Sequence, residues 1–217
     1  MTMNKPIKKA PIRDQIYDII KENILAGKYE PGSRLSIAAI SKELNVSNSP
    51  VREAISMLNK DGLVDIYPNS GPSVIRFSDR RLANIAQAIL SMLLGAFEIC
   101  QQSDKMDQLV GLLQEALKAQ IAHLEAETIQ EYVRYSIGFE NAFIRCCNNP
   151  YMTKQYSEME DLFYLVVLYN QWHIEKTRNH TVIEHQQILG AITRGDYPAA
   201  KDLLSKHYNR FQLEDER

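Results

Sequence analysis

The segment Val46-Ser47-Asn48-Ser49-Pro50-Val51-Arg52-Glu53-Ala54-Ile55 decides how the first part of this 217-residue chain folds. Ser49 is a residue type that caps helix N-termini, and Pro50 suits a first helical position, where no N–H donor is needed. Apolar residues follow at helical spacing, namely Val51, Ile55 and Leu58. We therefore predict a helix that is capped by Ser49, ends before Gly62 and carries Arg52 on a polar face.

Two further helices precede this segment, and a hairpin follows it. Isoleucines recur at helical spacing over residues 12–24, and residues 36–44 form a shorter apolar pattern after a serine that can cap it. The short β-prone runs 63–67 and 73–77 flank the turn-forming sequence Pro68-Asn69-Ser70-Gly71-Pro72. Three helices and a terminal hairpin predict a winged helix-turn-helix over residues 12–77, preceded by a flexible arm at residues 1–11.

The rest of the chain, residues 78–217, shows only helical patterns. We predict six helices with short connections, which together form an antiparallel six-helix bundle. Their expected ranges are Asp79–Ser103, Asp104–Ala126, Thr128–Cys147, Pro150–Glu175, Arg178–Arg194 and Asp196–Phe211. The fold class is thus mainly α, in two domains.

Composition and charge narrow the classes of protein. The hydrophobic and charged fractions, 45% and 24%, are those of a globular chain. Residues 1–77 hold 11 lysines and arginines against 8 acidic residues, whereas residues 78–217 hold 14 against 19, so a basic first domain precedes an acidic second one. This asymmetry fits a nucleic-acid-binding module. Three cysteines do not make a disulfide framework, and no uninterrupted apolar run is long enough to span a bilayer, so we expect a cytoplasmic protein without membrane contact.

The first domain resembles the DNA-binding domain of GntR-type bacterial transcription regulators. The resemblance covers about residues 12–77 and rests on an ordered series of matches, which are Tyr17, Gly27, Pro31-Gly32, Leu35, Val46-Ser47, Pro50-Val51-Arg52-Glu53-Ala54, Leu58, Gly62-Leu63-Val64 and Gly71. It implies that operator DNA is contacted by Ser47, Asn48, Ser49 and Arg52 at the head of the third helix and by Gly71 in the wing. Arg34 is a further candidate DNA contact.

The chemistry of these residues agrees with that role. Hydroxyls and free amides at a helix N-terminus suit phosphate oxygens, and Arg52, one turn into the helix, can reach O6 and N7 of a guanine. Many members of the family carry an arginine where this chain has Asn48, and a basic residue near Ala38. The operator sequence therefore cannot be copied from relatives.

Four polar residues fall on helix faces that should be buried in the bundle. They are Ser136 and Glu140 in the third predicted bundle helix, His185 in the fifth and His207 in the sixth. A carboxylate and two histidines inside a bundle are costly unless they are paired, hydrogen-bonded or bound to a metal. The same faces carry most of the apolar residues of these helices, so the four side chains are candidates for one internal site.

The second half is similar to the FCD-type effector domain that many GntR regulators carry. The matching residues are Phe139, Asn148-Asn149, Glu184-His185, Ile188, Leu189, Ala191-Ile192, Gly195-Asp196, Ala200 and His207. The resemblance implies a divalent metal (zinc, nickel or manganese) at the positions of Ser136, Glu140, His185 and His207. Serine is a poor ligand, which leaves Glu140, His185 and His207. Ile89 stands where relatives often place an effector-binding arginine.

Several alternatives stay open at this point. The internal site could bind a carboxylated metabolite with the help of a metal, bind a less polar effector without one, or be a paired core cluster without a ligand. The leading prediction is a DNA-binding regulator, a repressor whose operator affinity changes with an effector, and the alternatives are a constitutive dimeric DNA binder or a metal-dependent enzyme built on the bundle. We do not expect an enzyme, because an enzyme would leave the winged helix unexplained. Apolar residues on two sides of the helix 79–103 predict a homodimer through this region.

Overall fold

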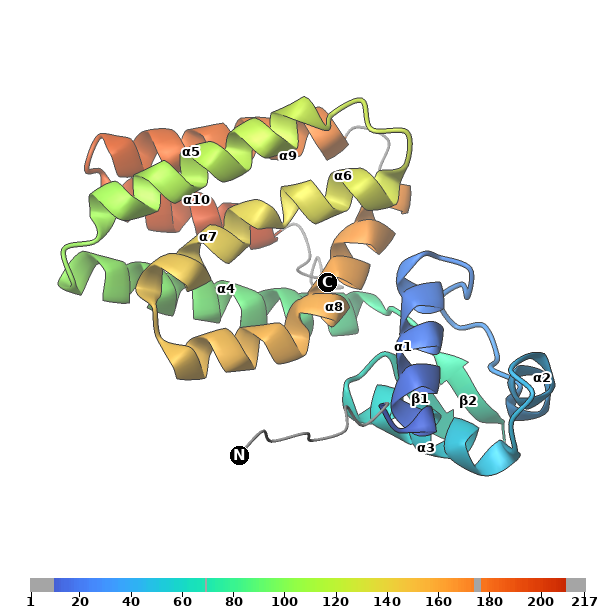
Figure 1. The fold of residues 1–217 in the computed structure, drawn as a ribbon. Coiled ribbons are helices and arrows are strands. Elements are labelled where there is room, and N and C mark those ends of the chain that lie inside the picture. Colours follow the sequence, from blue (N-terminus) through green and yellow to red (C-terminus); the bar gives the residue numbers. More distant parts are fainter. Residues whose placement is uncertain (1–9, 69, 174–176, 210–217) are drawn as a thin grey trace, which may run out of the picture. The chain divides into compact units, whose positions relative to one another are not determined.

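A computed structural model describes residues 10–68, 70–173 and 177–209 of the chain. The chain divides into two compact units, residues 1–76 and 77–217, so the boundary falls between Arg76 and Phe77. The predicted arm, residues 1–11, lies almost entirely outside the described residues. Figure 1 shows the order of the elements along the chain.

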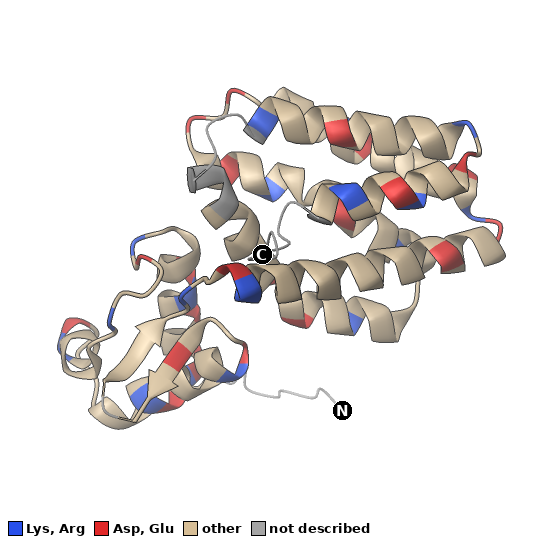
Figure 2. Ribbon diagram, turned by 180° about the vertical axis from the view of Figure 1, so that it is seen from behind, with Lys and Arg blue, Asp and Glu red and all other residues tan. Residues whose placement is uncertain are grey.

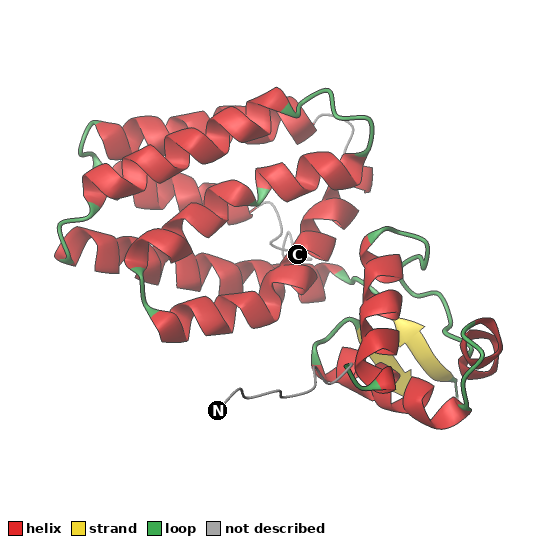
Figure 3. Cartoon of the chain, in the orientation of Figure 1, coloured by secondary structure: helices red, strands yellow, loops and turns green. Residues whose placement is uncertain are grey.

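The first unit contains three helices and a two-stranded antiparallel sheet (Figure 3). The helices are α1 (Ile12–Leu25), α2 (Ile37–Glu43) and α3 (Asn48–Lys60), and the strands are β1 (Val64–Tyr67) and β2 (Gly71–Val74). Val64 pairs with Val74 and Tyr67 with Gly71, which makes a tight hairpin. Ser36 caps α2 by accepting a hydrogen bond from the N–H of Ala39. The predicted winged helix-turn-helix is therefore confirmed as a fold.

The third helix and the two strands differ in their boundaries from the prediction. The third helix begins at Asn48 with Ser47 as its N-cap residue, so Ser49 and Pro50 lie inside the first turn. Pro50 is accommodated there because the first N–H groups of a helix have no intrahelical acceptor. The second strand begins at Gly71, two residues earlier than predicted, because the hairpin closes on the Tyr67–Gly71 pair, and it ends at Val74, three residues earlier than predicted.

The second unit is all helical in its described part, with seven helices where six were predicted. The helices are α4 (Asp79–Gln102), α5 (Met106–Ala122), α6 (Ile129–Ser136), α7 (Gly138–Cys147), α8 (Pro150–His173), α9 (Thr177–Thr193) and α10 (Tyr197–Asn209). Predicted helix ends at Glu175 and Phe211 lie outside the described residues, and the other ends agree within four residues. The three cysteines are buried and free.

The additional helix arises because the predicted segment Thr128–Cys147 is interrupted at Ile137. Ile137 keeps a near-helical backbone, and its N–H still bonds to the carbonyl of Val133, so the break is a local bend and not a loop. Ser136 and Gly138 flank it, and such small residues weaken a helix at this kind of position. The two halves still share one buried face, which carries Ser136 on α6 and Glu140 on α7.

Helix α4 packs against α7, α8 and α10 inside the bundle. Its charged residues lie near its two ends (Figure 2). Among the described helices it alone is long and apolar enough to cross a membrane, a test of length and composition that core helices of soluble proteins also meet. Residues from both apolar sides of α4 are buried within the chain, among them Ile89 on one side and Phe97 on the other, whereas Leu90 and Leu94 are half-buried.

Candidate functional site

The N-terminus of α3 presents a polar surface. Ser47, Asn48, Ser49 and Arg52 are all exposed there, while Val51, Ala54, Ile55 and Leu58 hold the opposite face of the helix in the core. The free N–H groups of the first turn add hydrogen-bond donors to the same surface. The structure thus brings together the four residues that the sequence predicted on the recognition helix.

The wing forms a second polar surface, next to a groove of about 400 Å³. Arg34 is exposed on a segment that runs along β2, where the N–H of Leu35 donates to the carbonyl of Pro72. The guanidinium of Arg34 lies beside Gly71, whose backbone is in the left-handed region with φ of 73°. Arg76 also lines the groove and was missed by sequence reasoning, because an arginine after a strand carries no pattern of its own.

Three of the four predicted internal residues meet in the helical unit. Glu140 on α7, His185 on α9 and His207 on α10 are each at most 4% exposed, and one ligand atom from each lies within 4.8 Å of the others. The carboxylate oxygen Oε1 of Glu140 is 3.4 Å from Nε2 of His185 and 3.7 Å from Nε2 of His207. We call these three residues the Glu-His-His centre. They are the one group of this kind that the described residues contain.

Each imidazole has a hydrogen-bond partner at Nδ1, the ring nitrogen that faces away from Glu140. Nδ1 of His185 is 2.8 Å from Oε1 of Gln120, and Nδ1 of His207 is 2.7 Å from Oε2 of Glu184. The side-chain Nε2 of Gln120 donates to the hydroxyls of Tyr132 and Ser136, which fixes its Oε1 as an acceptor. With each Nδ1 donating outward, Nε2 of each ring faces Glu140, where it presents a lone pair when the ring is neutral and an N–H when the ring is protonated.

When both rings are neutral, three electron-rich atoms converge on one buried point, and this state is stabilised by a positive charge between them. Burial raises the pKa of Glu140, but the charge of His185 and hydrogen bonds from both histidines outweigh it and hold this pKa well below the ordinary value. Glu140 is thus ionised at neutral pH. Its other oxygen, Oε2, has no hydrogen-bond partner among the described residues. The centre can accept either protons on its histidines or a metal ion.

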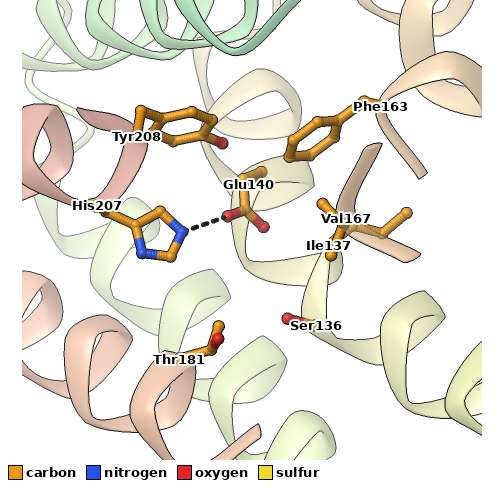
Figure 4. A pocket seen from close by; sticks show the side chains of 8 residues that line it. All are labelled: Ser136, Ile137, Glu140, Phe163, Val167, Thr181, His207 and Tyr208. Carbon is orange, nitrogen blue, oxygen red and sulfur yellow. Dashed lines mark ion pairs between the residues drawn. The ribbon is translucent and has the colours of Figure 1, made fainter. Parts of the chain in front are cut away.

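A small cavity adjoins the centre (Figure 4). Its lining residues come from five helices and the bend between two of them, and they are Ser136, Ile137, Glu140, Phe163, Val167, Thr181, His207 and Tyr208. Its volume of about 10 Å³ is near the lower limit for one water molecule. Ser136 lies at this cavity and is bonded to Gln120, whereas Ile89 is fully buried on α4 and does not line it.

Sequence reasoning missed Gln120 and Glu184 as partners of the two histidines. Glu184 precedes His185 directly and yet bonds to His207 on the next helix, which no local pattern indicates. Gln120 is fully buried on α5, on the same apolar face as Leu113 and Leu117. A polar residue in an apolar face was the sequence signal that could have identified it as part of the site.

A winged helix-turn-helix with an exposed recognition helix, joined to a helical domain with a buried polar centre, defines a class: DNA-binding proteins with a separate sensor domain. Residues 12–74 match the bacterial regulatory proteins of the gntR family, and residues 93–210 match the FCD domain. The chain therefore belongs to the GntR family and carries an FCD domain. It is a DNA-binding transcription regulator with an effector-binding domain.

Curated relatives and solved structures share this organisation. The HTH-type transcriptional regulator YdhC of Bacillus subtilis is 24% identical over 93% of this chain and 90% of its own. The HTH-type transcriptional repressor GlaR of Escherichia coli is 22% identical over 88% and 90%. A GntR transcriptional regulator from Rhodococcus sp. RHA1 has the same fold, with a TM-score of 0.71, 19% identity and coverage of 92% and 94%.

Proposed function

We propose that this protein is a homodimeric repressor whose affinity for operator DNA is lowered by a small effector bound beside a divalent metal ion at the Glu-His-His centre. The observation that carries the proposal is the convergence of three lone-pair donors on one buried point, with both imidazoles oriented from behind by Gln120 and Glu184. Metal-bound histidines usually have such outer partners. The name of the relative GlaR supports the repressor role.

The spacing of the ligand atoms fits a metal. Metal bonds of roughly 2.0 to 2.2 Å in a tetrahedral arrangement place ligand atoms roughly 3.3 to 3.6 Å apart. The Glu140–His185 and Glu140–His207 separations, 3.4 and 3.7 Å, are close to that range. Imidazole and carboxylate ligands suit zinc, nickel or manganese. When bound, such an ion supplies a Lewis-acidic position for an oxygen of the effector.

The effector is either a carboxylated metabolite or a less polar compound. Between Arg81 and Cys100, helix α4 contains no arginine, so a carboxylate would depend on the centre itself for charge. The adjoining cavity has room for about one water molecule, so an effector must displace lining side chains such as Phe163 and Val167 on α8. It then binds an opened arrangement of the bundle better than the described one, which is the differential affinity that a ligand-driven change requires.

Helix α8 also offers a route for this change. Tyr169, two residues after Val167, contacts the ring of Phe77 with the ring centroids 5.2 Å apart. Phe77 is the first residue of the helical unit, directly after the DNA-binding unit. A shift of α8 therefore acts on the segment that joins the two units. In the dimer, such a shift changes how two recognition helices, each with its Arg52, are held over the two halves of an operator.

The experiment measures metal content and DNA binding on the same preparations. Tag-free protein is supplied with zinc, nickel or manganese, dialysed, and analysed for metal per chain, and operator duplexes selected from random DNA are used for fluorescence anisotropy. We expect about one ion per chain in the wild type. The double variant His185→Ala/His207→Ala should lose that ion while it keeps metal-free affinity for DNA. A wild-type protein that retains none of the three metals contradicts the metal part of the proposal, and a protein that selects no DNA sequence contradicts the rest.

A further inference from the structure

The groove beside the hairpin has the size of a small-molecule site. Residues 32–35 run along β2 as a short extended segment, in which the N–H of Gly32 donates to the carbonyl of Val74 and Arg34 lies opposite Ser73. Leu35 and Val74, the next residue along each segment, are buried, so Arg34 and Ser73 occupy the outer face. The groove has a volume of about 400 Å³, within the roughly 300 to 1,000 Å³ of ligand pockets. We call it the wing groove, and its lining residues are Gly32, Arg34, Tyr67, Ser70, Gly71, Ser73 and Arg76.

The wing groove is positively charged. Arg34 and Arg76 contribute two guanidinium groups, and the described residues that line the groove include no acidic one. The guanidinium of Arg34 is exposed and makes no ion pair or hydrogen bond within the described part of the chain. Two guanidinium groups without a lining carboxylate favour an anion. Their planar sets of donors match the oxygens of a phosphate group in particular.

A glycine holds one of the two guanidinium groups in place. A Cβ atom at Gly32 would lie 3.0 Å from Nε and 3.3 Å from Nη2 of Arg76, so this guanidinium rests directly on the glycine. The backbone of Gly32 is also in the left-handed region, with φ of 80°. Contact with the backbone restricts the side chain of Arg76 before any ligand binds. Such preorganisation lowers the entropy that binding an anion would cost.

The wing groove also contains an uncovered aromatic ring. Tyr67 is 50% exposed, and its partner across the hairpin is Gly71, which has no side chain to cover the ring. The hydroxyl of Tyr67 lies 3.5 Å from a carboxylate oxygen of Asp65 on its own strand, so the face of the ring is what it offers to a ligand. The hydroxyls of Ser70 and Ser73 make no hydrogen bond within the described part of the chain. Exposed aromatic rings beside cationic side chains are used to stack nucleic-acid bases.

We propose that the wing groove binds a free nucleotide. Its phosphate accepts hydrogen bonds from Arg34 and Arg76, its base stacks on the ring of Tyr67, and its sugar hydroxyls bond to those of Ser70 and Ser73. The guanidinium groups alone would suit any small anion. The uncovered ring favours a nucleotide over inorganic phosphate or a simple carboxylate, because neither of these has a planar group to stack.

A nucleotide in the wing groove competes with operator DNA. Arg34 and Gly71 line the groove and are also expected to contact DNA, so one surface cannot serve both ligands at the same time. This consequence rests on the proposed function. Nucleotide binding itself depends neither on DNA nor on the Glu-His-His centre, which belongs to the other unit.

The test measures the heat of binding to the full-length protein in the absence of DNA. The probes are the ribonucleoside monophosphates, the corresponding nucleosides and inorganic phosphate, each at millimolar concentration. We expect at least one monophosphate to bind. Its nucleoside and inorganic phosphate should bind at least about tenfold more weakly, because each lacks one of the two recognised groups. If no monophosphate binds, the proposal is wrong.

Substitutions then place the binding in the groove. Arg34→Gln and Tyr67→Leu should each weaken nucleotide binding by about tenfold or more. Both positions are exposed, so neither variant should change the melting temperature. Lys42→Gln, at an exposed position of α2, also removes one positive charge and is the matched control. Equal weakening in Lys42→Gln and Arg34→Gln would reduce the effect to overall charge and contradict a site in the groove.

Two further results would assign the binding elsewhere. If a single-stranded oligonucleotide binds and is weakened by Arg34→Gln while no monophosphate binds, the groove contacts a DNA strand only and the proposal fails. Nucleotide binding that survives Arg34→Gln but disappears in His185→Ala/His207→Ala belongs to the Glu-His-His centre and equally overturns it.

Competition is measured last, by the anisotropy of labelled operator DNA. The nucleotide should displace the DNA more strongly than sodium chloride of equal ionic strength, a control that is needed because salt alone weakens DNA binding. Nucleotide binding without displacement contradicts the competition. A protein that selects no operator contradicts the proposed function, and the binding heats measured without DNA decide the nucleotide site separately.

Discussion

Gln120 links three buried groups, and its replacement is the sharpest test of how the Glu-His-His centre is built. Its Oε1 accepts from Nδ1 of His185 at 2.8 Å, and its Nε2 donates to the hydroxyls of Tyr132 at 3.0 Å and Ser136 at 3.2 Å. Gln120→Met keeps the length and volume of the side chain and removes all three bonds. Tyr132 keeps its hydrogen bond to the carbonyl of Arg178. The Nδ1–H group of His185 is therefore the buried donor that the replacement leaves without an acceptor.

The expected magnitude follows from these contacts. An unsatisfied buried donor costs about 1 to 3 kcal/mol, and each of the other two hydrogen bonds contributes about 0.5 to 1 kcal/mol. We therefore expect the free energy of unfolding to fall by about 3 kcal/mol. For a domain of this size, that loss lowers the melting temperature of the helical unit by roughly 6 to 12 °C. Without its acceptor, His185 is also free to change tautomer, and metal affinity should fall by about 10- to 100-fold.

The measurements are a thermal melt in the presence of chelator and a metal-affinity titration against a competing chelator. Gln114→Met, at an exposed position of the same helix, is the matched control and should change neither quantity. Gln120→Glu restores an acceptor for Nδ1 and should recover most of the metal affinity. If Gln120→Met melts and binds metal as the control does, Gln120 does not orient His185, and the argument from the direction of the Nε2 lone pairs fails with it.

The remaining predictions concern the other parts of the molecule. Arg52→Ala should weaken specific operator binding by about 1 to 3 kcal/mol in an anisotropy titration without a change in melting temperature. Lys60→Ala, at the far end of α3, is the control and should retain the sequence preference. Equal losses of specific binding in both variants would contradict a contact between Arg52 and a base. Gly71→Ala should destabilise the winged unit by about 1 to 2 kcal/mol in urea unfolding, because φ of 73° strains any residue with a Cβ. Gly111→Ala, in the interior of α5 with nothing within 4 Å of the added Cβ, should instead stabilise by about 0.5 to 1 kcal/mol, and a loss there would show unrecognised crowding. Phe77→Ala should leave metal binding intact but reduce the response of DNA affinity to an effector, and a full response would exclude the route through Tyr169.

The fold was largely readable from the sequence because its signals are local. Helical periodicity, the serine cap before α2 and the glycine at the hairpin pairing act over a few residues each, and they place the elements within a few positions. The predicted helix boundaries that differ from the structure fall where neighbouring residues are equally able to begin or interrupt a helix. Ser47 and Ser49 are both suitable caps, and the break at Ile137 lies between two small residues in a segment whose two halves both pack against α8.

The centre was readable only in part, for a physical reason. Glu140, His185 and His207 are polar residues on apolar faces, so burial makes each of them conspicuous in its own helix. Of their outer partners, Gln120 stands out in the apolar face of α5 and Glu184 does not, and no local pattern shows which ring either of them bonds to. Which residue bonds to Nδ1 of each ring depends on the packing of α5 against α9 and of α9 against α10, and those contacts join positions 65 and 23 residues apart.

The outer partners also explain how the centre can combine stability with response. A carboxylate between two imidazoles gains from a bound cation, and Gln120 and Glu184 hold both rings so that this gain needs no rearrangement. The side of the centre that faces the cavity is different, because Phe163 and Val167 belong to α8, whose described residues contribute no ligand atom to the centre. In the proposed mechanism, the ligand-bearing helices stay in place while α8 moves to admit an effector. Since α8 is also the helix that contacts Phe77, the proposed movement would reach the link to the DNA-binding unit.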